Sequence, residues 1–138
     1  METHVADIAS AIQMAVAPVF LLTAIATLIN VLNARLSRSI DRRRALDKMI
    51  GEAQDASAIE HLLIERAVHV HRLRVIYFGI FSAVLAALLI CLVVVGAFVG
   101  ALLTVEVSRI IAVLFIVAMV AMIMSLLLFL YEVFLMLK

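Results

Sequence analysis

The sequence contains few residues that break helices and few that support covalent or catalytic chemistry. It has one proline, one cysteine, four glycines and no tryptophan among 138 residues. The lone Cys91 excludes an internal disulfide. No CxxC pair, glycine-rich phosphate loop or nucleophile with an adjacent base is present, so we expect no enzymatic activity.

Charge is absent from three long segments. Ile8–Ala34, Val75–Val105 and Ile110–Tyr131 contain no Asp, Glu, Lys or Arg. Each is longer than the ~20 residues that a helix needs to cross a bilayer. The chain is 67% hydrophobic, with a mean hydropathy of +1.27, which excludes an ordinary soluble domain. We predict three transmembrane helices at about 8–34, 75–103 and 110–131. No acid lies in the middle of any span, so a proton-coupled transporter is not expected.

The basic residues gather in one segment. Nine of the eleven Lys and Arg lie between Arg35 and Arg74, whereas the leader METHVAD has none, so we expect no cleaved signal. The positive-inside rule places this segment in the cytoplasm, the N-terminus outside and the C-terminus inside. The arginines interpreted as topological anchors or lipid-headgroup contacts are Arg35, Arg38, Arg42, Arg44, Arg72 and Arg74.

The segment at about 35–74 is predicted to be an antiparallel helical hairpin. No Pro or Gly separates Ala34 from Ile50, so the first span should continue as a helix to about Gly51. Ser57–Glu60 (SAIE) has the form of a capping box, from which apolar residues at helical spacing run into the second span. The predicted fold is a single all-α membrane domain over 1–138, in which the first two transmembrane helices extend into a hairpin on the order of 20 Å beyond the membrane.

Charges within this hairpin are expected to pair. Arg66 is the only charge on an apolar stripe, and the antiparallel register brings it near Asp41, Arg43 and Asp47. A partly buried ion pair with Asp41 or Asp47 is predicted; the alternative is that Arg66 reaches water unpaired. Further expected pairs are Glu65 with Arg43 or Arg44, Glu60 with Lys48, and Glu132 with Arg35, Arg72 or Arg74.

Small residues mark two faces of the second span. Gly79, Ala83 and Ala87 recur every four residues, and Gly96 and Gly100 form a GxxxG motif on a different face. Such residues allow close helix packing in lipid. One face should contact the same chain and the other is a candidate contact in a homo-oligomer; alternatively, both pack within the chain.

Polar residues in the first span allow two interpretations. Thr23, Thr27 and Asn30 share one helix face and would line a water-filled path in an oligomer. Alternatively, they bond to a neighbouring helix or to their own backbone. The register places Asn30 near Gly79, which favours packing.

Cofactor and nucleic-acid binding have little support. His61 and His69 lie on one helix face with Glu65, but two histidines eight residues apart are too distant to share one ion without a second chain. They are weak candidates for metal or haem binding, and no cofactor is expected. Nucleic acid is not an expected partner either, because the hairpin has its own acids and no aromatic residues for stacking.

Two segments carry a family resemblance: APVFLLTAIATLINVLNARLSRSIDRRRALD (Ala17–Asp47) and LLIERAVHVHRLR (Leu62–Arg74). The chain resembles a family of small bacterial three-span inner-membrane proteins known only as a domain of unknown function. The shared elements are Pro18 and an RLxRxxDRxR segment that begins at Arg35 and ends at Arg44. The resemblance implies a bacterial inner-membrane location and this topology, and it implies no activity.

Three functions remain compatible with the sequence. The first is a non-enzymatic, homo-oligomeric scaffold or regulator whose cytoplasmic hairpin engages itself or a cytoplasmic protein partner. The second is an oligomeric channel-like protein lined by Thr23, Thr27 and Asn30. The third is a haem- or metal-binding membrane protein. In each case the lipid bilayer is the principal environment.

Overall fold

Three long helices make up almost the whole molecule. The computed structural model describes residues 1–138, with α1 at Glu2–Glu52, α2 at Ala56–Leu103 and α3 at Ser108–Leu137. All three are long and apolar enough to cross a membrane. The chain is therefore an all-α, three-span membrane protein, as predicted. Pro18 lies inside α1, which continues through it.

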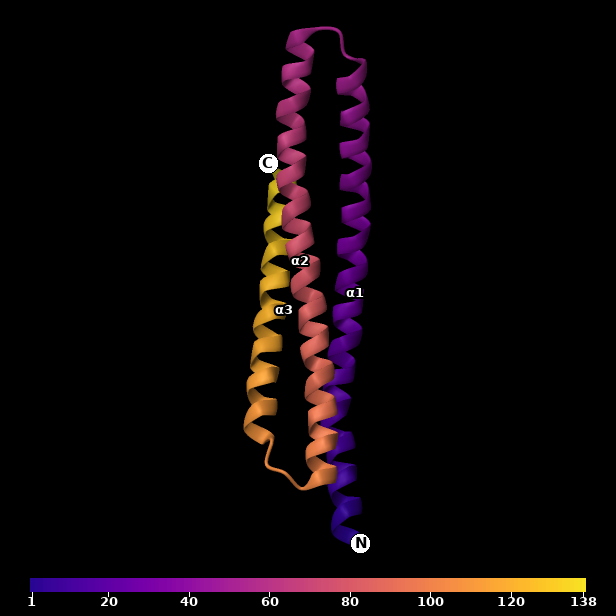
Figure 1. The fold of residues 1–138 in the computed structure, drawn as a ribbon, viewed down its shortest axis with the longest axis vertical. Helices are drawn as coiled ribbons and strands as arrows, with labels where there is room; N and C mark the ends of the chain where they lie inside the picture. The colour runs from indigo at the N-terminus through magenta and orange to yellow at the C-terminus, as the bar shows by residue number, and fades with distance from the viewer.

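The first two helices are much longer than a bilayer is thick. The 51 residues of α1 span roughly 76 Å at ~1.5 Å per residue, against ~30 Å of hydrocarbon. Figure 1 shows the α1–α2 turn at one end of the molecule, beyond the C-terminus of α3, and the N-terminus with the α2–α3 turn at the other. The α1–α2 pair thus extends past α3 as a helical hairpin.

The turn between α1 and α2 is short. The N-cap of α2 is Asp55, whose carboxylate accepts hydrogen bonds from the backbone N–H of Ser57 at 3.3 Å and from its Oγ at 2.9 Å. The capping box predicted with Ser57 as N-cap is therefore wrong: Ser57 lies inside the first turn, because the carboxylate of Asp55 already satisfies the free amide.

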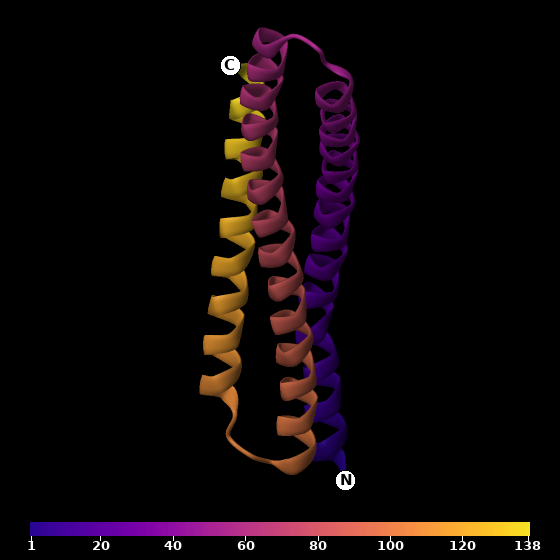
Figure 2. The same ribbon diagram turned by 45° about the horizontal axis from the view of Figure 1, so that its top comes forward.

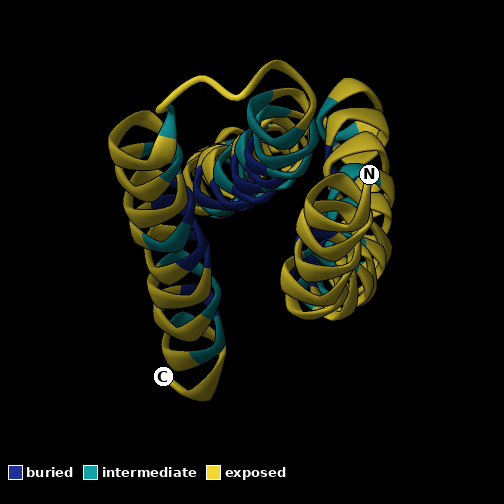
Figure 3. Cartoon of the chain, turned by 90° about the horizontal axis from the view of Figure 1, so that it is seen from below, coloured by how far each residue is buried: buried dark blue, intermediate teal, exposed yellow.

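Helix α2 is the centre of the arrangement. It packs along both α1 and α3, whereas α1 and α3 make few contacts with each other. Figure 2 shows α2 between its two neighbours, and Figure 3 shows that the buried residues of all three helices face inward. The core cluster consists of Ile25, Ala83, Ala86, Ile90, Ala118, Ala121 and Met122. Its four alanines let the helices approach closely where lipid removes the hydrophobic incentive to associate.

Most of the apolar surface faces outward. Only 18 of the 138 residues are buried, and large side chains such as Phe20, Phe81 and Ile116 are more than 60% exposed. An exposed apolar surface of this extent on helices of this length is suited to contact with lipid.

Candidate functional site

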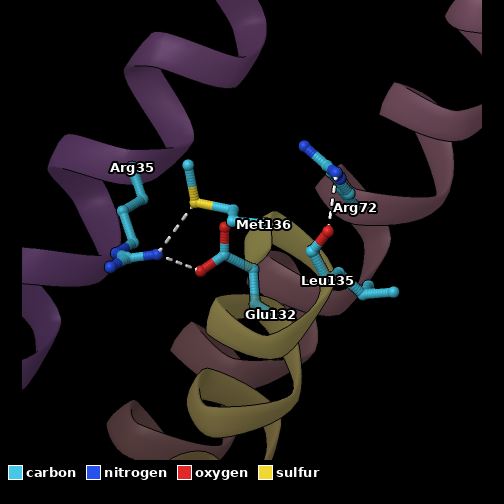
Figure 4. Close-up of polar contacts among 5 residues, drawn as sticks. All are labelled: Arg35, Arg72, Glu132, Leu135 and Met136. Carbon is cyan, nitrogen blue, oxygen red and sulfur yellow. Dashed lines mark hydrogen bonds and ion pairs between the residues drawn. The ribbon is translucent and has the colours of Figure 1, made fainter. Parts of the chain in front are cut away.

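A polar junction joins the three helices near the C-terminal end of α3. Glu132 of α3 is 4% exposed and forms an ion pair with Arg35 of α1. The same guanidinium donates to Met136 Sδ at 3.5 Å and lies 4.8 Å from the centre of the Phe129 ring. Figure 4 shows Arg35 and Glu132 pointing toward each other across the gap between α1 and α3. Of the three arginines predicted to pair with Glu132, Arg35 is the partner.

Arg72 attaches α2 to the same junction. Its Nη2 donates to the backbone carbonyl of Leu135 at 3.0 Å, as Figure 4 shows, and its Nε is buried without a partner. The last carbonyls of a helix have no partner within the helix, so a cation that bonds one of them stabilises the helix end. Arg35 and Arg72 therefore hold the end of α3 against both other helices.

A buried hydrogen bond lies deeper in the bundle. Ser125 Oγ of α3 donates to the Gly79 carbonyl of α2 at 2.8 Å, and the Gly79 Cα faces the side chains of Leu32 and Leu128. Leu32, two residues after Asn30, is the residue of α1 that packs beside Gly79, and Asn30 itself is exposed. Sequence reasoning missed Ser125, although it is the only serine or threonine in the third charge-free segment.

The polar face of the first span bonds locally. Thr23 Oγ1 donates to the Val19 carbonyl at 3.3 Å, and Thr27 Oγ1 donates to the Thr23 carbonyl at 3.0 Å. Both threonines and Asn30 are exposed. The structure thus matches the interpretation in which the threonine hydroxyls bond to their own backbone, which satisfies them without a water-filled path.

Both small-residue faces of α2 are used within the chain. Gly79 and Ala83 are buried and Ala87 is half-buried. A Cβ on Gly96 would lie 3.4 Å from Ile111, and one on Gly100 would lie 2.5 Å from Val107 Cγ2. These contacts match the alternative in which both faces pack within the chain, because Gly96 and Gly100 lie against α3 and the turn before it.

Two ion pairs cross the hairpin. Arg66 Nε lies 2.9 Å from Asp47 Oδ1, and Arg42 Nη2 lies 2.6 Å from Glu65 Oε1. Of the two acids predicted for Arg66, Asp47 is the partner; Asp41 makes no ion pair. The pair is more exposed than expected, with side chains 39% and 43% exposed, because two helices alone cannot enclose it.

Two other predicted pairs are wrong. Glu65 binds Arg42 rather than Arg43 or Arg44, because neighbouring residues point in directions ~100° apart around a helix. Glu60 and Lys48 form no ion pair, and both are exposed.

The histidines do not form a metal centre within the chain. His69 Nε2 lies 3.9 Å from Glu65 Oε1, and His61 is exposed. No group of three or more His, Cys, Asp or Glu side chains is placed to hold a metal ion. The contact between His69 and Glu65 lies within α2, and Glu65 in turn binds Arg42 of α1.

The hairpin is expected to lose stability as the solution is acidified. The bond from Arg42 holds the pKa of Glu65 below its usual 4.5, and burial, with the charge of Arg72, lowers the pKa of His69 below its usual 6.5. In both cases the unfolded chain binds protons more readily than the folded chain, so the free energy of unfolding decreases as the pH is lowered. The His69 contribution begins to be lost below pH 6.5, and that of Glu65 only below pH 4.5.

Thermal unfolding of the purified protein between pH 7.5 and 5 tests this expectation. The His69→Gln variant should lose less stability over this range than the unsubstituted chain. The exposed His71 provides the control, and His71→Gln should keep the original pH dependence. Equal pH dependence in all three proteins would show that His69 has no part in the effect.

Comparison with known families assigns the chain to one of them. A family described as "Protein of unknown function (DUF2721)" matches residues 15–138, which is most of the sequence. The chain belongs to the DUF2721 family. The match covers most of α1 and all of α2 and α3, and it confirms the resemblance to a domain of unknown function noted in the sequence. No curated protein and no solved structure matches. DUF2721 membership brings no assigned activity, so any function must be argued from the molecule itself.

Proposed function

We propose that this protein is a non-enzymatic, homo-oligomeric scaffold or regulator of the bacterial inner membrane. Its charged helical hairpin contacts the hairpins of other copies or a cytoplasmic protein. The proposal rests on one observation: ion pairs join the two helices of the hairpin, and several other exposed charges of the hairpin have no partner in the chain.

The unpaired charges are of both signs. Arg42 and Arg66 brace the hairpin through their ion pairs with α2 and α1 acids. The exposed charges of the hairpin that make no ion pair or hydrogen bond include Arg38, Asp41, Arg44, Lys48 and Glu60. Two copies of a surface with interspersed charges of both signs can align acids with bases, and such complementarity favours specific association.

A groove at the opposite end of the bundle supports self-association. It lies between α1, α2 and α3, and its lining includes the small residues Ala15, Ala17, Ala97 and Ala101, which are exposed or half-buried. Grooves lined by small residues accept another transmembrane helix at short range. A helix of a second copy is the proposed occupant.

Orientation follows from charge. Nine of the eleven Lys and Arg lie between Arg35 and Arg74, which assigns the hairpin to the cytoplasm, the N-terminus to the outside and Lys138 to the inside. The channel and cofactor alternatives receive no comparable support, because the two threonine hydroxyls bond locally and the histidines form no ligand cluster.

The mass of the particle in mild detergent tests the proposal. Light scattering with chromatography should give a defined multiple of the 15.1 kDa chain. Ala97→Leu, which fills the groove, should shift the equilibrium toward monomer. The matched control is Ala24→Leu on the exposed face of α1, which should leave the mass unchanged. A strict monomer with no co-purifying protein would overturn the proposal.

A further inference from the structure

A second groove lies between α1 and α2 at the level where the hairpin leaves the bundle. It has a volume of about 570 Å³, within the range of ~300–1,000 Å³ usual for ligand sites. Ile40 and Arg43 contribute from α1, and Arg74, Tyr77, Phe78 and Phe81 from α2. The groove is therefore charged at one end and aromatic at the other.

The two arginines in the groove have no anionic partner. Arg35, Arg42 and Arg66 each bind a carboxylate, and Arg72 binds a backbone carbonyl. Arg43 and Arg74, in contrast, make no ion pair or hydrogen bond within the chain, and both are exposed. Two guanidinium groups that line one groove from separate helices suit a phosphate, because the planar fork of arginine matches phosphate oxygens.

The aromatic end continues from these arginines into the membrane span. Arg74, Tyr77, Phe78 and Phe81 follow the spacing of a single helix face. Tyr77, Phe78 and Phe81 are 54%, 59% and 66% exposed, so the chain leaves more than half of each residue uncovered. Position 74 is two residues from Arg72, which binds the end of α3, and α2 is free of charge from Val75 onward. The arginines consequently lie at the membrane surface and the rings lie below it.

We propose that this groove binds one anionic phospholipid from the leaflet on the hairpin side. Its phosphate lies between Arg43 and Arg74, and an acyl chain lies along Tyr77, Phe78 and Phe81. Basic pockets between transmembrane helices bind anionic headgroups in this way. The inference rests on the membrane character of the chain, and it holds whether the protein is a monomer or an oligomer and whichever side of the membrane the hairpin occupies.

Native mass spectrometry of the full chain in mild detergent tests the site. The probe is phosphatidylglycerol, compared with phosphatidylcholine that has the same acyl chains. We expect one phosphatidylglycerol to be retained per chain, with at least tenfold weaker retention of phosphatidylcholine. Equal retention of the two lipids would overturn the assignment.

Matched variants separate the site from general charge attraction. The double variant Arg43→Gln with Arg74→Gln should weaken phosphatidylglycerol binding at least tenfold. Arg38→Gln with Arg44→Gln removes the same charge from exposed, unpaired arginines outside the groove and should leave binding unchanged. If both double variants weakened binding equally, the lipid would be attracted by net charge alone, and the proposal would be overturned.

Two further experiments identify the source of the phosphate and the role of the aromatic rings in the groove. Millimolar inorganic phosphate should not displace the lipid, because the acyl chain contributes to binding; displacement would assign the groove to a free anion. Phe78→Ala should weaken retention, whereas Phe20→Ala, which removes an exposed ring of α1 outside the groove, should not. If Phe78→Ala binds like the unsubstituted chain, the proposed acyl position is wrong.

Discussion

Replacement of Glu132 by glutamine is expected to lower the free energy of unfolding by about 3 kcal/mol. The side chain of Glu132 is 5% exposed and is the ion-pair partner of Arg35, whose side chain is 25% exposed. Removal of one member of a buried pair leaves the other charge desolvated and uncompensated, which costs ~3–5 kcal/mol. Because Arg35 is partly exposed, we expect a loss at the lower end of this range. Reversible unfolding in mixed micelles measures the change.

The exposed pair in the hairpin is the matched control for this prediction. Arg66→Met breaks the bond to Asp47, but both side chains are well exposed, so the loss should be about 0–1 kcal/mol. The double variant Arg35→Met with Glu132→Leu should be more stable than the sum of the single changes predicts, because neither charge is then left alone. Additive effects, or equal losses at Glu132 and Arg66, would contradict the assignment of the junction.

Replacement of Gly79 by leucine should also lower stability by about 3 kcal/mol. The position lies where all three helices meet, and a Cβ there already comes within 3.8 Å of Leu128 and Leu32. A larger side chain would force the helices apart and break the bond from Ser125 to the Gly79 carbonyl. The same unfolding measurement, with circular dichroism to follow helix content, detects this loss.

Two substitutions show whether side-chain size is the cause. Gly79→Ala adds only a Cβ at ordinary contact distance and should be tolerated. Gly51→Leu places the same leucine where nothing lies within 4 Å of the Cβ, so it should be neutral or slightly stabilising. A comparable loss at Gly51 and Gly79 would mean that the three-helix packing at Gly79 is incorrect.

The fold could be predicted from the sequence because it follows from the length of the charge-free segments and from where helix-breaking residues are absent. Charge-free segments longer than a bilayer must be helices in lipid, and the absence of Pro and Gly between Ala34 and Ile50 leaves nothing to end the first helix. Glu132 was recognisable in the same way, because a carboxylate near the end of an apolar helix needs a cation.

The choice between neighbouring residues as contact partners could not be predicted. Spacing along the chain gives the height of a residue along the helix axis, but not the direction in which its side chain points around that axis. Arg42 rather than Arg43 binds Glu65, and Leu32 rather than Asn30 packs beside Gly79. Each error amounts to one or two residues, which is enough to turn a side chain away from its expected partner. The groove that contains Arg43 and Arg74 was missed for the same reason, since it depends on how α1 and α2 face each other.

Cysteine labelling from each side of the membrane tests the central claim most directly. In a Cys91→Ser background, a membrane-impermeant maleimide should reach Gly51→Cys only from the cytoplasmic side and Glu106→Cys only from the opposite side. Both positions are exposed, in the hairpin and in the α2–α3 turn respectively. Labelling of both from the same side, or no reaction of Gly51→Cys from either side, would contradict a helical hairpin that α1 and α2 carry out of the membrane.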